Sequence, residues 1–369
     1  MTRRRRAVVA GTFAPDYSRN RILLGLLADA GLDIEVARFD LWGDERAGLP
    51  DQPKLSLVMR ALCGYPRLLL RLLTTAKPDL FVVLYPGQLD VLLVTAVGRL
   101  RGVPTIYDHF ISLEETVVQD RGLRNASSAT ARLLRLLDRL ACRAPRLVLA
   151  DTPADAAYFA NSAGTSADRF RVLWVGAQED VFAPRPVDVD PQLVFFHGTY
   201  IPLHGIDTIV RAAKLLEHDG IRFRLLGTGQ ERAAVERLVQ ELEVQNVELH
   251  DPVPLDELAA HIARAALCLG IFGTTAKAAR VVPNKVFEYL AVGRPVLTAA
   301  TPAIASAFAD EVAVVPPGQP SALAAKVRSL VGNPVELSRL AAAGRARFAR
   351  DYARVPLARL LAKYLAELQ

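Results

Sequence analysis

Short runs of apolar residues alternate with segments of helical periodicity along almost the whole chain. This alternation is typical of parallel sheets whose consecutive strands are joined by helical crossovers. Six runs of strand length in the first half lie at residues 7–10, 34–37, 80–84, 105–107, 147–150 and 172–174. Six more in the second half lie at residues 193–196, 223–226, 247–249, 267–271, 296–298 and 312–315. The pattern therefore predicts an α/β protein built from two Rossmann-like, doubly wound parallel-sheet domains.

A segment without either period separates the two halves. Residues 176–191 are rich in proline and acidic residues, so we expect an interdomain linker there. This divides the chain into an N-terminal domain over residues 1–178 and a C-terminal domain over residues 190–350. Residues 351–369 predict one more helix. Its apolar face consists of Val355, Leu357, Leu360, Leu361, Tyr364 and Leu365.

Composition agrees with two cores in an intracellular protein. The chain has 369 residues, of which 51% are apolar, and this length suits two domains better than one. It contains no charge-free apolar run of about eighteen residues, and no signal-peptide core follows the basic start. We therefore expect a cytoplasmic protein. Cys63, Cys142 and Cys268 lie far apart in apolar surroundings, which predicts reduced thiols and argues against a disulfide framework or a cysteine metal site.

The formal net charge of +6 is concentrated in the first half, because residues 1–185 hold 25 Lys and Arg against 20 Asp and Glu. Basic helix faces of this kind can contact an anionic membrane, so peripheral association with the inner membrane face is one interpretation. Ordinary solvated helix faces are the other. Nucleic acid is disfavoured, because aromatic residues do not interleave with the arginines. The basic clusters are Arg3–Arg6, Arg67 with Arg71, and Arg132, Arg135, Arg139, Arg143 and Arg146.

Residues 280–296 carry the most specific signals. Pro283 suits the first turn of a helix, and Gly293 stands where that helix would end before a buried strand at 295–299. The backbone N–H groups at the helix start, beside Asn284 and Lys285, are suited to hold a diphosphate. Glu288, one turn further on, can accept hydrogen bonds from ribose hydroxyls. Any α/β protein can also place a proline-started helix before an apolar strand, which is the alternative.

This segment resembles the donor site of family 4 glycosyltransferases, which are retaining enzymes of the GT-B fold. The resemblance is to the branch with the pattern Pro-x-Lys-x-x-Glu-Tyr-x-Ala-x-Gly-x-Pro-Val. It implies an interdomain cleft, with a nucleoside-diphosphate sugar on the C-terminal domain and an unknown acceptor on the N-terminal domain. It also implies that the final helix crosses back onto the N-terminal domain. No metal and no cofactor besides the sugar donor is expected.

The chain departs from the family pattern at two places. The family's Glu-x7-Glu pair is incomplete, because Arg280 stands where the first acid is usual. In the loop after residue 196, Gly198 matches, but Thr199 and His204 replace a common Arg and Lys. A protonated His204 can take over the role of that Lys, or it can simply pack in the loop. Lys285 adds a further positive charge, and we count His204 and Lys285 among the catalytic candidates.

Other donor-site candidates rest on shorter matches. Gly227 and Gly229 join a strand to a helix, and tight strand–helix packing is the default explanation for such a pair. Val253 matches a family segment that meets the base. Lys277 and Arg280 lie close in sequence to the proposed diphosphate site, where either a phosphate contact or plain solvation would account for them.

The acceptor candidates come from the N-terminal domain. His109 follows a predicted strand and resembles the histidine that retaining GT-B enzymes place against the donor sugar, which makes it the leading catalytic candidate; a loop histidine bonded to backbone is the alternative. Asp108 and Glu114 are its neighbours. The remaining candidates follow the first strand and are expected to border the acceptor pocket: Gly11, Thr12, Phe13 and Asn20.

Three other functions remain open at this stage. Nucleotide-sugar epimerases share the GT-B architecture, although they should place more groups suited to proton abstraction in the cleft. A non-catalytic scaffold is suggested by the missing acid at residue 280. A dinucleotide-dependent oxidoreductase is the least favoured, since neither half has a full Gly-x-Gly-x-x-Gly with a suitably spaced ribose-binding acid.

Overall fold

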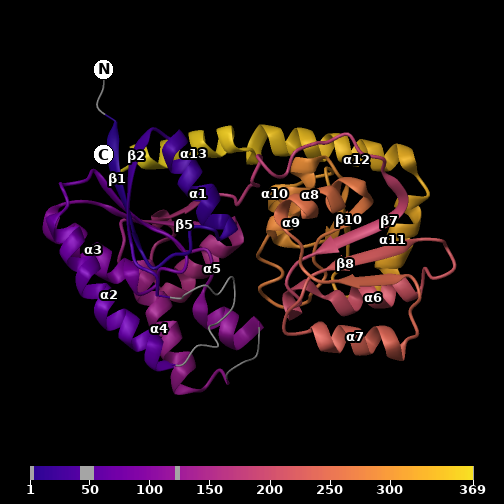
Figure 1. The fold of residues 1–369 in the computed structure, drawn as a ribbon, viewed down its shortest axis with the longest axis horizontal. Helices are drawn as coiled ribbons and strands as arrows, with labels where there is room; N and C mark the ends of the chain where they lie inside the picture. The colour runs from indigo at the N-terminus through magenta and orange to yellow at the C-terminus, as the bar shows by residue number, and fades with distance from the viewer. Residues whose placement is uncertain (1–3, 42–53, 121–124, 369) are drawn as a thin grey trace. The chain divides into compact units, whose positions relative to one another are not determined.

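The computed structural model describes residues 4–41, 54–120 and 125–368, and the chain divides into two compact units (Figure 1). The N-terminal unit comprises Met1–Trp174 together with Val355–Gln369, and the C-terminal unit comprises Val175–Arg354. Residues 176–189, which join the two sheets, contain neither helix nor strand. Arg3, part of the predicted basic start, lies outside the described residues.

The N-terminal unit is built on a parallel sheet of six strands in the order β2-β1-β3-β4-β5-β6. Both the parallel pairing and the reversal of strand order after β1 agree with the predicted doubly wound sheet. The strands are β1 (Arg5–Gly11), β2 (Leu32–Arg38), β3 (Leu80–Val83), β4 (Thr105–Asp108), β5 (Leu147–Ala150) and β6 (Phe170–Val172).

Helices cover both faces of this sheet. Side chains alternate between the two faces along each strand, so both faces of the sheet carry apolar residues. One face packs against α2, α3, α4 and α5, and the other packs against α1 and α13. Ser128 and Thr152 cap α4 and α5, each by accepting a hydrogen bond from a backbone N–H of the first turn. The helices are α1 (Ser18–Asp29), α2 (Lys54–Thr74), α3 (Asp90–Arg101), α4 (Ala129–Arg143), α5 (Pro153–Ala163) and α13 (Arg354–Ala366).

The final helix α13 belongs to the N-terminal unit. Leu357, Leu361 and Leu365 are buried against the β1 and β3 side of the core, and the Tyr364 hydroxyl donates a 2.9 Å hydrogen bond to the carbonyl of Val172. Val355, which the sequence placed on the same apolar face, is exposed. The helix begins at Arg354, after a short π-helix at Phe348–Tyr352.

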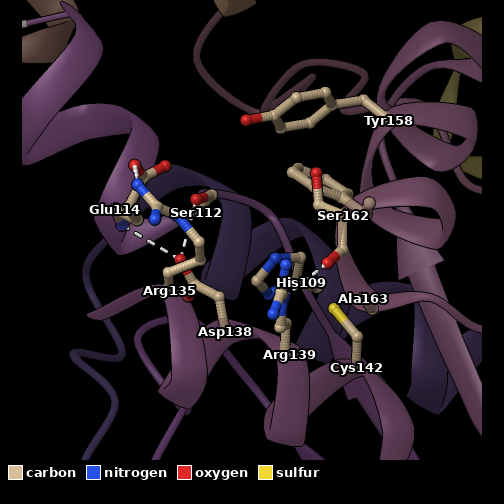
Figure 2. A pocket seen from close by; sticks show the side chains of 11 residues that line it. His109, Ser112, Glu114, Arg135, Asp138, Arg139, Cys142, Tyr158, Ser162 and Ala163 are labelled. Carbon is tan, nitrogen blue, oxygen red and sulfur yellow. Dashed lines mark hydrogen bonds and ion pairs between the residues drawn. The ribbon is translucent and has the colours of Figure 1, made fainter. Parts of the chain in front are cut away.

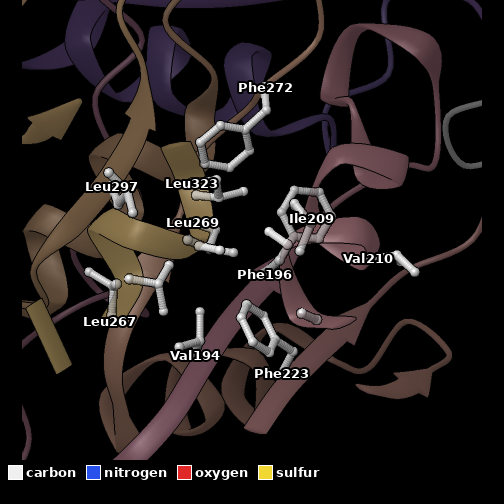
Figure 3. Close-up of a cluster of buried hydrophobic side chains, with 14 of the residues drawn as sticks. Val194, Phe196, Ile209, Val210, Phe223, Leu267, Leu269, Phe272, Leu297 and Leu323 are labelled. Atoms are coloured by element: carbon white, nitrogen blue, oxygen red, sulfur yellow. The ribbon is translucent and has the colours of Figure 1, made fainter. Parts of the chain in front are cut away.

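The C-terminal unit repeats the design, with six parallel strands in the order β12-β11-β10-β7-β8-β9. Figure 3 shows part of its core, where Phe196, Leu267 and Leu269 of neighbouring strands meet Ile209 and Leu323 of two covering helices. The strands are β7 (Asp190–His197), β8 (Arg222–Leu226), β9 (Val247–His250), β10 (Ala265–Leu269), β11 (Val296–Ala299) and β12 (Ala313–Val315). The helices are α6 (Ile206–Lys214), α7 (Arg232–Glu241), α8 (Leu255–Arg264), α9 (Asn284–Val292), α10 (Pro302–Ala307), α11 (Pro320–Val331) and α12 (Pro334–Arg347).

All twelve predicted strands have a counterpart, and two of them are displaced by two residues. The strand expected at residues 267–271 is formed by Ala265–Leu269. The strand expected at residues 172–174 is formed by Phe170–Val172. Leu173 still donates its N–H to Ala150, but the carbonyls of Leu173 and Trp174 accept hydrogen bonds from the buried Arg19 guanidinium. A side chain far away in the sequence therefore takes the acceptors that a longer strand would have used. Among the described residues, no helix combines the length and the apolar character needed to cross a membrane.

Candidate functional site

Two glycine-containing loops pack against each other at the carboxyl ends of β7 and β8. The N–H of Gly198 donates to the carbonyl of Leu226, and the N–H of Tyr200 donates to the carbonyl of Thr228. Gly227 has a φ of +145°, and a Cβ atom there would lie 1.9 Å from the carbonyl oxygen of Gly198. Gly229 packs in the same close way against the backbone of Tyr200. Gly227 and Gly229 thus serve loop packing in this structure, which was the default interpretation of this pair.

Replacing Gly227 with alanine should destabilise the protein by about 3 kcal/mol, because the new methyl group combines an unfavourable φ with a backbone clash. Gly220→Ala is the matched control: its φ is +73°, but no atom lies within 4 Å of the added Cβ, so about 1 kcal/mol is expected. Urea unfolding of both variants measures the difference. Equal losses would show that the two loops do not need their close approach.

Helix α9 carries the second part of the site. It begins one residue later than the sequence indicated, since Pro283 is the capping residue and Asn284 the first helical residue. It ends as predicted at Gly293, which has a φ of +82°. Every residue of this helix from Lys285 to Val292 is buried. Two charged side chains, Lys285 and Glu288, are therefore held inside the unit, which requires compensating partners.

Glu288 faces a histidine from the end of β7. Its Oε2 lies 3.1 Å from Nε2 of His197, and the N–H of His197 donates a 3.2 Å hydrogen bond to the hydroxyl of Tyr289. The two facing atoms are at ion-pair distance but are not aligned for a hydrogen bond, and neither has another hydrogen-bonding partner among the described residues. Sequence analysis did not single out His197. This pair leaves buried polar atoms that a ligand rich in hydroxyl groups would satisfy.

Lys285 lies beside the histidine that follows the glycine loop. Its Nζ is 3.3 Å from Nε2 of His204 and 4.3 Å from the centre of the Phe196 ring. Burial lowers the pKa of Lys285 to about 7, against a smaller upward influence of Glu288. Burial and then the Lys285 charge hold the pKa of His204 well below its usual value. His204 is therefore a neutral acceptor for Lys285 here, rather than the protonated phosphate ligand that the sequence suggested as one option.

Gly198 allows the glycine loop to approach this group. A Cβ atom at Gly198, where φ is +149°, would lie 2.7 Å from Nζ of Lys285 and 3.1 Å from Cε1 of His204. Lys277 and His197 also lower the pKa of His204 through their charges. Elements from β7, the following loop and α9 thus converge on one group of buried and half-buried residues, which we call the α9 cluster: His197, Gly198, His204, Lys285 and Glu288.

The remaining predicted donor residues lie in loops of the C-terminal unit and at the start of α9. Thr199 is exposed, and Pro283 and Asn284 are half-buried at the start of α9. Lys277 and Arg280 lie in the loop between β10 and α9, where burial lowers the pKa of the Arg280 guanidinium. Val253 is half-buried in the loop between β9 and α8.

In the N-terminal unit, His109 borders a cavity of about 240 Å³ between α4 and α5 (Figure 2). Its Nδ1 lies 3.2 Å from the Tyr107 hydroxyl, its N–H donates to the carbonyl of Leu149, and its ring packs edge-on against Phe159 at 4.4 Å. Burial lowers the pKa of His109, so a neutral imidazole is favoured at pH 7.

Charged and hydroxyl groups line the opposite wall of this cavity. Arg135 donates to Glu114 over 2.8 Å, and the Ser112 hydroxyl donates to Asp138 over 2.8 Å (Figure 2). The backbone N–H of Glu114 also donates to Asp138. The structure thus brings together His109 and Glu114, as expected, and adds Ser112, Arg135 and Asp138, which sequence analysis did not assign to a site. A usable signal was present, because Asp138 is the single acidic residue in the otherwise basic α4.

Several acceptor candidates must be corrected, because their groups are already used inside the unit. Asp108 is fully buried and accepts hydrogen bonds from Arg19 on both carboxylate oxygens. The buried Asn20 donates its amide to the carbonyls of Ala14 and Tyr85. Asp108 therefore holds the fold together rather than facing a ligand. The amide nitrogen of Asn20 is used in the same way, while its Oδ1 has no hydrogen-bonding partner among the described residues.

The end of β1 is also a structural feature rather than a pocket wall. Thr12 donates both its N–H and its hydroxyl to the buried Asp90 carboxylate, at 2.8 and 2.9 Å. A Cβ at Gly11 would lie 2.6 Å from the same carboxylate, and Phe13 packs in the core beneath α1 and α13. Gly11, Thr12 and Phe13 thus shape the turn after β1, and we withdraw the side chains of Thr12 and Phe13 as acceptor contacts.

Comparisons with known proteins agree with this architecture. Residues 3–176 match the family model of a glycosyl transferase 4-like domain, and residues 207–361 match a model described as glycosyl transferase-like. No curated protein sequence matches the chain. The two matches together span most of the chain, so the sequence is similar to glycosyltransferase domains in both halves; the particular sequence branch stays a prediction.

Solved structures establish the fold. Sucrose-phosphate synthase from Thermosynechococcus elongatus is similar with a TM-score of 0.74 at 16% identity, covering 99% of both chains. The Anabaena protein Alr3699/HepE in complex with UDP gives a TM-score of 0.72 at 14% identity, covering 98% of this chain and 100% of that one. The lipopolysaccharide outer core galactosyltransferase WaaB gives 0.65 at 12% identity, covering 99% of both. This likeness and the two six-stranded parallel sheets confirm the predicted GT-B fold.

Proposed function

We propose that this protein transfers a sugar from a nucleoside-diphosphate donor to an acceptor hydroxyl with retention of the anomeric configuration. The observation that carries the proposal is the α9 cluster, in which a buried lysine and a buried glutamate are held on one helix behind a glycine loop. A cation and a hydroxyl-binding carboxylate one turn apart suit the two ends of a nucleoside diphosphate.

In this proposal the diphosphate lies at the start of α9, against Lys285. The helix N-terminus and the ammonium group both favour negative charge, and burial in a site of low dielectric strengthens that attraction. Glu288 then receives ribose hydroxyls, which would supply the hydrogen bonds that its Oε2 lacks in the protein. We assign the neutralising charge to side chains and the helix start, and we propose that the donor needs no metal ion or further cofactor.

The chemistry follows from charge that develops as the donor breaks. Departure of the nucleoside diphosphate builds negative charge on its β-phosphate and leaves an oxocarbenium-like sugar, which the acceptor hydroxyl attacks from the same face. Lys285 and the helix start stabilise the leaving group, and that is the main contribution of the protein. The leaving phosphate oxygen accepts the acceptor's proton, so the proposal requires no protein nucleophile.

For the acceptor side we propose the cavity bordered by His109 and Glu114. It offers the neutral imidazole of His109, the ion-paired carboxylate of Glu114 on the opposite wall, and the phenol of Tyr158. Such a lining suits hydroxyl-bearing acceptors, because both donors and acceptors of hydrogen bonds face the same space.

The test is to incubate the full chain with nucleotide sugars, and uridine donors come first because the similar Anabaena protein binds UDP and UDP-glucose. Proton NMR follows the anomeric signals with the donor alone and with an acceptor panel. A new glycoside with the donor's anomeric configuration supports the proposal. An epimerised nucleotide sugar formed from the donor alone supports an epimerase instead, and donor binding without any conversion over the whole panel supports a non-catalytic scaffold.

Donor affinity should fall as pH rises through 7, because the pKa of Lys285 is about 7 and a diphosphate binds the charged ammonium. Above that pKa the affinity should drop by up to roughly tenfold per pH unit, until it reaches the level of the neutral amine. Isothermal titration with a nucleotide sugar measures this, since its doubly esterified diphosphate keeps a constant charge. Lys285→Met should bind weakly at every pH. A pH-independent wild-type affinity above pH 7 would contradict this role.

A further inference from the structure

Helix α4 turns small and polar residues toward the sheet and exposes several of its leucines. The side that faces the sheet carries the small or polar residues Ala131, Asp138, Ala141 and Cys142. Three of its five leucines point the other way: Leu133 is 64% exposed, Leu136 51% and Leu140 42%, while the other two leucines are half-buried. A helix that covers a sheet normally buries its large apolar side chains, and single exposed leucines are common, but three on successive turns of one face form a patch.

Helix α2 continues the same feature. It packs on the same face of the sheet as α4, with Leu68 and Leu72 in the core that also contains Ala141 and Cys142 (Figure 1). Its outer side exposes five large apolar residues, and such a concentration of exposed apolar side chains is typical of an interaction surface. They are Val58, Met59, Leu62, Leu70 and Leu73.

The charges around these side chains have one sign. In the described parts of α2, α3 and α4, the acidic residues are Asp90 and Asp138, and both are buried. Among the described side chains of the three helices, the exposed charges are arginines. We call the exposed side of α2 and α4, with the arginines that flank its leucines, the leucine–arginine face. Those arginines are Arg60, Arg67, Arg71, Arg132, Arg139 and Arg143.

We propose that the leucine–arginine face docks on the surface of an anionic lipid bilayer. Leucines of this spacing reach the boundary of the acyl chains, while arginines remain at the level of the negatively charged headgroups. This inference is independent of the proposed catalytic function. It gives a location to the membrane contact that the basic N-terminal half suggested.

The charge pattern separates this partner from the other candidates. A second copy of the chain would bring arginines of the same face against each other, and such like charges oppose association. The arginines could bind the phosphates of a nucleic acid, but a nucleic acid would leave the exposed leucines without an apolar partner. An anionic bilayer satisfies both kinds of side chain at once.

Flotation of the full chain with lipid vesicles tests the proposal. One set contains equal parts of phosphatidylglycerol and phosphatidylcholine, and the other contains phosphatidylcholine alone. The wild-type protein should float with the anionic vesicles, less so with rising salt, and should not float with the neutral ones. Failure to float with the anionic vesicles at low salt would overturn the proposal.

Two variants locate the contact. Leu133→Ser combined with Leu136→Ser and Leu140→Ser should weaken vesicle binding by at least about tenfold, because the apolar anchor is lost. Arg60→Glu combined with Arg67→Glu and Arg132→Glu should weaken it by a similar factor or more. Both sets are exposed, so the thermal unfolding midpoint should stay close to that of the wild type.

Matched controls lie elsewhere on the surface. Leu215→Ser with Val335→Ser removes exposed apolar groups of the C-terminal unit, and Arg359→Glu with Lys363→Glu reverses charge on α13; both controls should bind vesicles as the wild type does. Unchanged binding of the leucine variant would overturn the proposal. A wild-type dimer in light scattering that the leucine variant converts to monomer would also overturn it, since the face would then cover a second copy.

Discussion

Replacing Glu288 with alanine should weaken binding of nucleoside-diphosphate sugars by about a hundredfold or more. The carboxylate is buried on α9 with Oε2 free of a hydrogen-bonding partner in the described part of the chain, and a bond from a ligand hydroxyl to a charged group contributes about 1.5–3 kcal/mol. Two ribose hydroxyls on one carboxylate therefore give the stated factor. Isothermal titration of the wild type and Glu288→Ala with the same donor measures it.

Two further variants make this result specific. Glu288→Gln keeps the length and one acceptor oxygen but loses the charge, so its affinity should lie between those of wild type and Glu288→Ala. Glu336→Ala removes a half-buried carboxylate that is paired with Arg339 at the start of α12 in the same unit, and it should bind the donor normally. A folded Glu288→Ala protein with unchanged donor affinity would show that Glu288 does not bind the ribose hydroxyls.

Replacing His109 should reduce turnover by roughly tenfold to a thousandfold while changing donor affinity little, because the residue is proposed to act on the sugar and the acceptor. Its Nδ1 lies beside the Tyr107 hydroxyl, which leaves Nε2 as the nitrogen to meet a substrate. Steady-state kinetics with a productive donor and acceptor, together with donor titration, separates the two effects.

The choice of variant matters at this position. The ring of His109 packs against Phe159 at 4.4 Å, so alanine creates a cavity that by itself costs stability. His109→Phe fills the space without a nitrogen and should lose turnover as well. Cys142→Ala changes the wall of the same cavity and should keep the turnover of the wild type. Full activity in His109→Phe would exclude the imidazole from the mechanism.

The fold could be predicted from the sequence because the patterns that indicate strands and helices are local in the chain. Strand-length apolar runs and helical periodicity found twelve strands, and two of them, expected at residues 172–174 and 267–271, were displaced by two residues. The displacement of the first arises from Arg19, whose guanidinium reaches the carbonyls of Leu173 and Trp174. A contact between residues 154 positions apart leaves no trace in a local pattern.

The same distinction explains what was found of the site. The start and end of α9 follow from Pro283 and Gly293, so Lys285 and Glu288 were placed on one helix correctly. Their partners were not predictable from spacing: His197 meets Glu288, and His204 meets Lys285, only because the loop after β7 folds over α9. The neutral state of His204 follows from burial, which periodicity does not measure.

The acceptor side shows the limit most clearly. Asp108 ends β4 and Thr12 follows β1, while Asn20 lies on α1, the helix after β1. Ligands of parallel sheets bind near such strand ends, and this position made the three residues candidates. In the structure, Arg19 pairs with Asp108, two backbone carbonyls take the Asn20 amide, and Asp90 takes Thr12. A polar group at a strand end can either bind a ligand or form hydrogen bonds within the fold. Which of the two it does depends on partners that are distant in the sequence.

The central claim is that the α9 cluster binds a nucleoside diphosphate. Thermal unfolding of the full chain in the presence of UDP, GDP, ADP and dTDP tests it most directly, because a ligand that binds only the folded state stabilises it by RT ln(1 + [L]/Kd). We predict that at least one of them raises the unfolding temperature in a concentration-dependent way, and that Glu288→Ala and Lys285→Met lose this rise. No shift with any nucleoside diphosphate, or an equal shift in both variants, would contradict the account.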